Sequence, residues 1–474
     1  MKRVIRPFVL LLSALFLTVS CMSDDDDFAD ITFYSDTAIT SFSLGTLNRT
    51  MWTKSSTGED SSYVAELQGS NYKFYIDQIN RKIYNPDSLP KGTDAAHVIC
   101  NVTSKNSGTI VIKNVDSDTL NYYDSEDSID FTQPREFRVY ALDGSAYRAY
   151  TVSVNVHKED PDSLNWHDTG ICPDFTSMTG MKAVAVGGRL TVLGCVGGAT
   201  VAYSRQTAEG AAWSRLTTNV ALDAGAYSNL TEYAGTIYTV SGGSVLASVD
   251  GATWNVVCAQ GPARLLGAGR KKMYGLGQDG RPVVSEDGGA TWTADGIVGD
   301  AANLPSQDFS LACLPLDTDD EAEYVIMTGN RDVAACPDDS VAMVWNKVEE
   351  YSDGSQPHSW MYCNERNNHE LPRLSNLTVV AYGDVLLAVG GRGQGTSTAA
   401  AFSQAYVSED NGLTWHKNGS YYLPEGFTND GSDVFALAVD DDDYMWLVAG
   451  GTGDVWRGRL NRLGWEDWQT SFTE

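Results

Sequence analysis

Carboxylates are the most abundant residues in this chain that could carry out catalysis. The chain has 62 Asp and Glu residues, and two carboxylates about 5–10 Å apart are enough for a glycoside hydrolase. The six histidines are scattered along the sequence, at His97, His157, His167, His358, His369 and His416. Neither a His-Glu-x-x-His zinc motif nor a Gly-x-Ser-x-Gly nucleophile motif is present. Glycan hydrolysis therefore stays open, but spacing alone does not identify the carboxylate pair.

Four consecutive aspartates, Asp440 to Asp443, form a second group with ligand chemistry, because carboxylate oxygens bind Ca²⁺. The run lacks the alternating spacing and the glycine of an EF-hand loop. We therefore interpret it as a solvated turn. We expect no metal site and no cofactor.

One motif recurs in the C-terminal part of the chain. Residues 285–292 read Ser-Glu-Asp-Gly-Gly-Ala-Thr-Trp, residues 408–415 read Ser-Glu-Asp-Asn-Gly-Leu-Thr-Trp, and residues 248–254 form a copy one residue shorter. Ser and Asp side chains can accept from nearby backbone N–H groups, Gly supplies a positive φ, and Trp anchors the next strand. We expect hairpin turns in which the following residues are structural: Asp250, Trp254, Asp287, Trp292, Asp410 and Trp415.

This Ser-x-Asp-x-Gly-x-Thr-Trp pattern resembles the Asp-box of sialidase-type β-propellers. A sialidase also carries an Arg-Ile-Pro motif early in its propeller, and here the nearest fragment is Arg281-Pro282. In sialidases the Asp-box turns lie on the rim, away from the active site. The resemblance therefore implies architecture, not sialidase activity.

Strand patterns repeat around these motifs over residues 165–474. Each repeat has two apolar strands, the second often ending in Gly-Gly, then a third strand and a Trp that opens the fourth. The six Trp residues lie 38 to 68 residues apart, at Trp213, Trp254, Trp292, Trp360, Trp415 and Trp465. Four short strands per repeat predict propeller blades, and Gly-Gly resembles kelch repeats. We predict six blades. Residues 165–167 look like a further fourth strand, which either pairs beside the last blade or remains from a seventh.

The preceding region, residues 36–157, has short alternating strands separated by turn clusters. Its clearest hairpin joins 137–141 to 150–156 through Asp143-Gly144, a dipeptide suited to a turn with positive φ. This pattern predicts an immunoglobulin-like β-sandwich. Residues 158–164 contain a polar, Pro-bearing break that we interpret as a linker.

The first 20 residues have the form of a signal peptide, with a positive start and a short apolar run. Thr18-Val19-Ser20-Cys21 resembles a lipobox, which implies lipid attachment at Cys21. Residues 21–35 then form an acidic tether, whose Asp24 to Asp27 run resembles the export signal of surface lipoproteins of Bacteroides-like bacteria. We expect a membrane partner through this lipid and a location on the outer face of the outer membrane. The seven later cysteines do not form a disulfide framework.

The order of these parts resembles an uncharacterised family of Bacteroides surface lipoproteins with an N-terminal immunoglobulin-like domain and a C-terminal kelch/Asp-box propeller. This resemblance implies location and architecture. The net charge of −29 disfavours nucleic acid as a partner, because the phosphate backbone would be repelled.

Binding residues are expected in the longest loops of the propeller, residues 328–340, 363–378, 391–404 and 419–433. Arg, Asn and Tyr side chains there could bond sugar hydroxyls or stack on sugar rings. The candidates are Asn330, Arg331, Asn364, Arg366, Asn367, Asn368, His369, Arg392, Gln394, Tyr421 and Tyr422. We predict a non-catalytic lipoprotein that binds a glycan or a neighbouring outer-membrane protein and assists nutrient capture. The alternative is a propeller-type glycoside hydrolase, not a sialidase.

Overall fold

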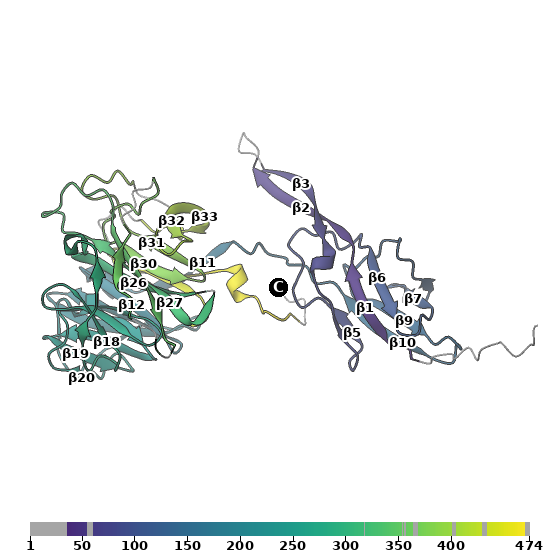
Figure 1. Cartoon of the computed structure of the whole chain (residues 1–474), viewed down its shortest axis with the longest axis horizontal. Coiled ribbons are helices and arrows are strands. Elements are labelled where there is room, and N and C mark those ends of the chain that lie inside the picture. The colour runs from purple at the N-terminus through teal and green to yellow at the C-terminus, as the bar shows by residue number, and fades with distance from the viewer. Residues whose placement is uncertain are drawn as a thin grey trace, which may run out of the picture. The chain divides into compact units, whose positions relative to one another are not determined.

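The computed structural model describes residues 36–54, 60–316, 318–352, 354, 357–363, 368–400, 404–428 and 434–469. These residues form two compact units, one of residues 36–159 with 466–469 and one of residues 160–465. Strands dominate both units (Figure 1). Within the described ranges, no helix is long and apolar enough to cross a membrane. The all-β class expected from the sequence is confirmed.

The described residues of the first unit form one large and two small sheets. The large sheet has the strand order β4 (Tyr75–Asp77), β5 (Lys82–Tyr84), β10 (Tyr147–Ser153), β9 (Arg135–Tyr140), β7 (Ile110–Lys113) and β8 (Leu120–Tyr122). The small sheets are the pair β1 (Ile39–Leu44) and β6 (Cys100–Ser104), and the pair β2 (Thr46–Lys54) and β3 (Asp60–Gln68). A single 3-10 turn, η1 (Gly69–Asn71), follows β3.

The hairpin predicted at Asp143-Gly144 is present. Strands β9 and β10 pair antiparallel, with Tyr150 opposite Phe137. Gly144 has a φ of 69°, and its N–H donates to the carbonyl of Ala141 at 2.9 Å. A left-handed residue is needed at this point, and glycine adopts that conformation without strain.

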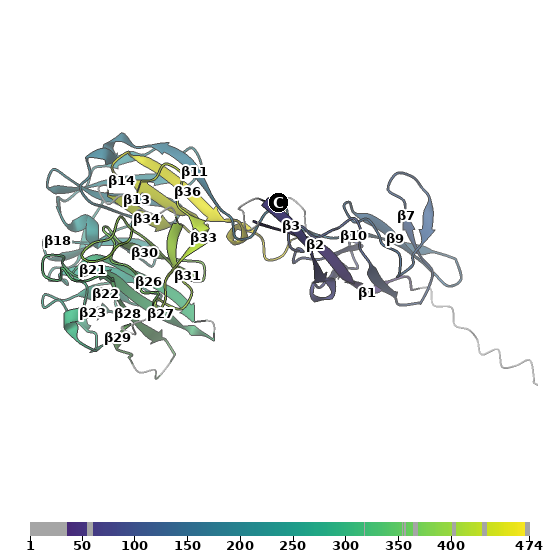
Figure 2. The same cartoon turned by 90° about the horizontal axis from the view of Figure 1, so that it is seen from above.

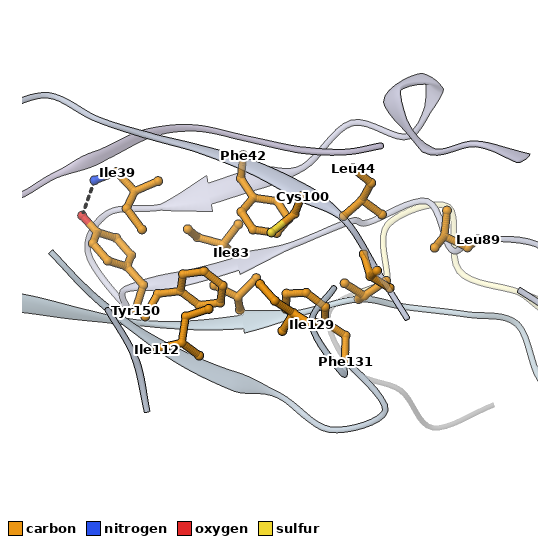
Figure 3. Close-up of a cluster of buried hydrophobic side chains, with 14 of the residues drawn as sticks. Ile39, Phe42, Leu44, Ile83, Leu89, Cys100, Ile112, Ile129, Phe131 and Tyr150 are labelled. Atoms are coloured by element: carbon orange, nitrogen blue, oxygen red, sulfur yellow. Dashed lines mark hydrogen bonds between the residues drawn. The ribbon is translucent and has the colours of Figure 1, made fainter. Parts of the chain in front are cut away.

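The core of the first unit lies between the β1–β6 pair and the large sheet. Figure 3 shows Phe42 and Cys100 from the pair facing Ile83 and Ile112 from the sheet. Tyr150 is fully buried there, and its hydroxyl accepts from the N–H of Ile39 at 3.3 Å. Burial of each large apolar side chain contributes roughly 1.5–3 kcal/mol. The two layers differ in their number of strands, two against six, and β10 pairs parallel with β5. The immunoglobulin-like assignment stays a prediction.

Residues 466–469 pack with the first unit. The Gln469 N–H donates to the carbonyl of Pro86 at 3.0 Å, and the Trp468 indole donates to the Tyr84 hydroxyl at 3.2 Å. The Trp468 ring also lies edge-on to Tyr75, with centroids 5.3 Å apart. The expected propeller range of 165–474 included these residues, whereas their aromatic partners lie in the first unit.

The described residues of the second unit form six sheets. Their orders are as follows: β12 (Met181–Val186), β13 (Arg189–Val196), β14 (Ala199–Gln206) and β15 (Ser214–Leu216), with β16 (Leu222–Asp223) also on β14; β17 (Thr231–Tyr233), β18 (Thr236–Ser241), β19 (Ser244–Ser248) and β20 (Asn255–Cys258); β21 (Arg264–Ala268), β22 (Met273–Leu276), β23 (Pro282–Ser285) and β24 (Thr293–Ala294); β26 (Gln307–Leu316), β27 (Asp319–Asn330), β28 (Met343–Glu350), β29 (Trp360–Tyr362) and β25 (Ile297–Val298); β30 (Thr378–Tyr382), β31 (Val385–Val389), β32 (Gln404–Ser408) and β33 (His416–Tyr422); β34 (Phe435–Val439), β35 (Met445–Ala449), β36 (Asp454–Leu460) and β11 (Leu164–Ile171). Short 3-10 turns connect some of them, namely η2 (Pro173–Ser177), η3 (Ala226–Asn229), η4 (Ala301–Asn303) and η5 (Asn461–Gly464).

The first strands of these sheets form a closed ring. In chain order β12, β17, β21, β26, β30 and β34 each contact the next, and β34 contacts β12. Figure 2 shows β34, β30, β26 and β21 following one another. The interior of the second unit is therefore lined by one strand from each sheet.

The ring closes through the earliest strand of the second unit. Strand β11 pairs antiparallel with β36, with Trp166 opposite Gly458. This pairing settles the two readings of residues 165–167, because the strand lies beside the last sheet. The expectation that Trp465 opens the fourth strand of the last repeat is wrong, since β11 occupies that position and Trp465 follows η5.

The three recurring motifs fold into nearly identical turns. In residues 285–292, Asp287 accepts from the Thr291 N–H at 2.9 Å and from its hydroxyl at 2.6 Å, and Ser285 accepts from the Gly289 N–H at 2.9 Å. The Trp292 indole donates to the Gly289 carbonyl at 3.0 Å. The same bonds recur around Asp410 with Trp415 and around Asp250 with Trp254. These bonds lower the pKa of Asp287 and of Asp250 to about 2.

Candidate functional site

A cavity of about 630 Å³ lies at the centre of the second unit. Its wall is made of the first strands of the six sheets, β12, β17, β21, β26, β30 and β34, with η3 beside them. Polar atoms supply more of the exposed wall than apolar atoms do. A cavity of this size falls within the range of small-ligand pockets, about 300–1,000 Å³. We call it the central pocket.

Charged residues of the central pocket stand at the beginnings of four inner strands. Lys182 is the second residue of β12, Glu232 is the second of β17, Arg264 is the first of β21 and Asp308 is the second of β26. Glu232 also accepts from the Gly235 N–H at 2.7 Å. Tyr227 of η3 lines the same pocket. Four sheets therefore combine their charges in one cavity.

The Lys182 ammonium is the most perturbed cation of the pocket. Burial, together with the positive charge of Arg264, lowers its pKa to about 8. Lys182 is half-buried, and among the described residues its ammonium has neither a hydrogen-bond partner nor an ion-pair partner. Its charge is therefore partly desolvated and uncompensated, which costs stability.

Arg264 is better supported than Lys182. Its Nη1 donates to the Ser228 hydroxyl at 3.2 Å, and its guanidinium lies 4.9 Å from the centroid of the Phe309 ring. Burial lowers the pKa of Arg264, while the Tyr227 hydroxyl and the Asp308 carboxylate act in the opposite direction. The guanidinium is thus held in place while part of its donor fork stays available.

Asp308 is fixed by a residue from the neighbouring strand. The buried Asn330 amide donates to Asp308 Oδ2 at 2.8 Å and to the carbonyl of Leu374 at 2.7 Å. Asp308 has a φ of 52°, a conformation that non-glycine residues rarely adopt. Burial raises the pKa of Asp308, and the bond from Asn330 and the charges of Arg373 and Arg264 oppose that rise.

Tyr227 packs closely against a glycine. A Cβ added at Gly180 would lie 2.1 Å from the Tyr227 hydroxyl oxygen, so a side chain at this position would displace the Tyr227 ring. Burial raises the pKa of Tyr227, and the hydroxyl therefore stays protonated at neutral pH. It can act as a hydrogen-bond donor to a ligand.

Two of the binding candidates from the sequence have internal partners. Asn330 is fully buried and holds Asp308, as described above. Arg331 forms a two-pronged ion pair with Asp339, at 2.8 Å from Nε and 2.6 Å from Nη2, and also donates to the carbonyl of Ala302 at 3.1 Å. Both residues brace the loop after β27.

The remaining candidates do not converge on one place. Tyr421 is buried, with its ring edge-on to Tyr382, whereas Tyr422 is half exposed. Gln394 is half-buried, and Arg392 and His369 are exposed. The His369 ring lies 4.3 Å from that of His416. None of these residues lines the central pocket. Asn368 is exposed, and Cys21, Asn364, Arg366 and Asn367 lie outside the described residues.

The aspartate run 440–443 forms a turn between β34 and β35. The buried Asp440 accepts from the N–H groups of Asp442 and Tyr444 at 3.0 and 2.9 Å, and from the Trp446 indole at 2.8 Å. Within the described ranges, no group of three His, Cys, Asp or Glu side chains is arranged to hold a metal ion. The seven cysteines from Cys100 to Cys363 are unpaired.

A second group of charges is buried outside the central pocket. The Lys347 ammonium contacts Asp295 at 2.9 Å and pairs with Glu349, and it lies over the rings of Tyr274 and Trp360. Trp360 donates its indole N–H to Asp295 at 2.8 Å. Because each charge here has a partner and none lines the central pocket, the group holds two adjacent sheets together.

Sequence reasoning missed Lys182, Arg264 and Asp308. A signal existed for the first two, because each charge stands at the beginning of an otherwise apolar strand, Met181–Val186 and Arg264–Ala268. A lysine or arginine in a strand packed between sheets needs solvent or a partner, and in a propeller the central cavity can supply it.

The comparisons with known proteins support the architecture. Residues 160–467 match the family model described as the DUF6242 beta propeller domain. Residues 42–154 match the model described as the N-terminal domain of the domain of unknown function DUF6242. The β-propeller predicted from the sequence is thereby confirmed. No curated protein matches the chain.

Several solved structures share part of this arrangement. YCF48 from Cyanidioschyzon merolae has 12% identity and a TM-score of 0.34, covering 62% of this chain and 98% of that one. The calcium structure of a Trichoderma reesei carbohydrate-active enzyme of family AA12 has 10% identity and a TM-score of 0.36, covering 63% and 96%. A quinonprotein alcohol dehydrogenase-like protein from Bacteroides thetaiotaomicron has 11% identity and a TM-score of 0.29, covering 76% and 92%. These likenesses carry no argument about function.

Proposed function

The chain belongs to the DUF6242 family, and from this premise we propose that it is a non-catalytic binding protein displayed on the cell surface. Its second unit is a β-propeller, which we propose to have six blades of kelch- and Asp-box-like repeats and to bind a glycan. Its first unit is an immunoglobulin-like spacer. In this proposal the protein assists nutrient capture, with a lipid at Cys21 as its membrane anchor.

The central pocket is the observation that carries this proposal. Its wall combines apolar residues of the inner strands with polar groups from different sheets, among them Lys182, Arg264, Tyr227, Asp308 and Glu232. Polar groups that converge on one cavity are typical of a ligand pocket, where they fix the orientation of the ligand. A cavity of about 630 Å³ suits a sugar unit better than a protein surface, which needs a broad interface.

The two carboxylates of the pocket are each occupied by a neighbour. Asp308 accepts from Asn330, and Glu232 accepts from the Gly235 N–H. A hydrolase needs two carboxyl groups about 5–10 Å apart, one to give a proton and the other to activate water or attack the sugar. Glycoside hydrolysis by Asp308 and Glu232 is the second candidate function, and a hydrolysis screen tests it.

A glycan array and a parallel hydrolysis screen test the proposal. The protein for both is residues 28–474, which lacks the expected leader and acidic run but retains all described residues. Binding of a glycan without release of products supports the proposal. Turnover of any glycan overturns the proposal. If no glycan binds and the protein instead binds an outer-membrane protein, the propeller is assigned to a protein partner.

Anchoring is tested separately on the full-length chain in the producing cell. If a lipid is attached at Cys21, the native chain should stay with the membrane fraction and Cys21→Ala should release it. Protease added to intact cells should cleave the anchored chain if it is displayed outside. Retention of Cys21→Ala in the membrane would contradict the lipid anchor.

A further inference from the structure

The central pocket holds two neighbouring cations inside a strongly acidic protein. The whole chain carries a formal charge of −29, yet Lys182 and Arg264 line the same cavity. They are near enough that the charge of Arg264 lowers the pKa of Lys182. A like charge nearby disfavours the charged form of a group, which costs the empty fold stability.

The charges that line the pocket are equal in number but are not all paired. Lys182 and Arg264 contribute two positive charges, and Asp308 and Glu232 contribute two negative charges. Asp308 accepts from the Asn330 amide, and Glu232 accepts from the Gly235 N–H. Among the described residues, neither carboxylate forms a hydrogen bond or an ion pair with Lys182. A ligand with a single negative charge would give the Lys182 ammonium a partner.

We propose that the central pocket binds the carboxylate of an acidic saccharide, with Lys182 and Arg264 as the two cations that hold it. This inference rests on the proposed glycan-binding function and names the class of glycan. Arg264 can present paired N–H donors to a carboxylate, and Lys182 can add a donor and a charge. Tyr227, Ser306 and Gln307 also line the pocket and can bond sugar hydroxyls.

A carboxylate fits these charges better than a phosphate group does. Phosphate carries more than one negative charge at neutral pH, and Asp308 and Glu232 would repel the excess. A carboxylate brings one charge, which matches the single unpartnered ammonium of Lys182. Its flat shape also matches the two-pronged donor geometry of a guanidinium.

Matched pairs of acidic and neutral sugars show directly how much the carboxylate adds to the affinity. Glucuronate and glucose, and galacturonate and galactose, are titrated calorimetrically into the purified protein at pH 7, with inorganic phosphate as a further ligand. We expect each uronate to bind at least about tenfold more tightly than its neutral partner, the gain expected from charged hydrogen bonds. Phosphate should bind more weakly than either uronate.

Substitutions of Lys182 and Arg264 test whether these two cations cause the preference for uronates. Lys182→Gln and Arg264→Gln should each weaken uronate binding about tenfold or more, and Lys182→Arg should keep most of it, because it retains the charge. The matched control is Arg281→Gln, which removes an exposed arginine outside the pocket and should leave the affinity unchanged. Circular dichroism shows whether each variant is folded.

The outcomes separate this inference from the proposed function. Equal binding of glucose and glucuronate, unaffected by Lys182→Gln, would overturn the inference while leaving glycan binding intact. Phosphate bound as tightly as the uronates would also overturn it. Absence of binding to any saccharide, acidic or neutral, would remove both.

Discussion

The side-chain amide of Asn330 donates a 2.8 Å hydrogen bond to the carboxylate of Asp308. Through this bond the end of β27 holds one of the two carboxylates that line the pocket with Lys182 and Arg264, the other being Glu232. The same amide group also donates to the carbonyl of Leu374, which precedes the next sheet. Asn330 therefore ties three segments together behind the pocket wall.

Replacement of Asn330 should destabilise the propeller. Asn330→Ala leaves the Leu374 carbonyl and the Asp308 carboxylate without their buried donor, and each such loss costs about 1–3 kcal/mol. We expect a fall of about 2–4 kcal/mol in the free energy of unfolding, measured with urea. The exposed Arg392→Ala serves as control and should change stability by less than about 0.5 kcal/mol. Equal effects of the two substitutions would show that Asn330 is not a brace.

Removal of the Lys182 charge should stabilise the empty protein. The pKa of Lys182 in the fold, about 8, lies below its ordinary value, so the charged form is disfavoured by folding. This cost is fully present below pH 8 and disappears as pH rises above the unfolded pKa of about 10.4. Lys182→Met should therefore raise the free energy of unfolding by roughly 1–3 kcal/mol at pH 7, and less at pH 10.

A loss of stability in Lys182→Met at pH 7 would contradict this account. A merely structural lysine stabilises the fold it belongs to, whereas a lysine kept for a ligand costs stability until the ligand arrives. The same variant should lose uronate binding. Stability and binding therefore move in opposite directions, which a general packing defect would not produce.

The buried ion group around Lys347 should behave in the opposite way. Lys347→Met leaves the carboxylates of Asp295 and Glu349 buried and partly uncompensated, which typically costs about 3–5 kcal/mol. Arg462 makes exposed ion pairs with Asp162 and Asp384, so Arg462→Met should cost less than about 1 kcal/mol. Urea unfolding of both variants at pH 7 compares them. Similar small losses would show that the Lys347 group does not hold its sheets.

The aspartates of the recurring turns should contribute stability that depends on pH. The folded pKa of Asp250 and of Asp287 is about 2, below the ordinary value of about 3.9. Their stabilisation is therefore fully present above pH 4 and is lost as pH falls toward 2. The double variant Asp250→Asn/Asp287→Asn should have a lower melting temperature than the native chain, and this difference should narrow as pH falls from 4 toward 2. A difference in melting temperature that does not depend on pH would contradict the assigned role of the two carboxylates.

Local features of the fold could be predicted from the sequence. The turns at residues 248–254, 285–292 and 408–415 are built by side chains that bond within four residues, so their geometry is encoded in the motif itself. The Asp143-Gly144 hairpin is local in the same way. The family match to residues 160–467 agrees with the propeller that these repeats indicated.

Features that depend on distant partners could not be predicted. Trp465 was assigned to a fourth strand by its spacing, but β11, from the other end of the unit, pairs there with β36. The sequence places Asn330 and Arg331 in a loop, and it does not reveal that they bond to Asp308 and Asp339. The central pocket itself is assembled from six separate strands. Only the ring of sheets brings its charges together.

The pH dependence of uronate affinity tests the central claim most directly. If the charged form of Lys182 holds the carboxylate, the affinity for glucuronate should be highest below pH 8. It should fall as pH rises through the pKa of about 8, because deprotonation removes the charge. The decline should approach tenfold per pH unit in calorimetric titrations from pH 6 to 10, and Lys182→Arg should shift it to higher pH. An affinity that stays constant from pH 6 to 10 in the native chain would contradict the claim.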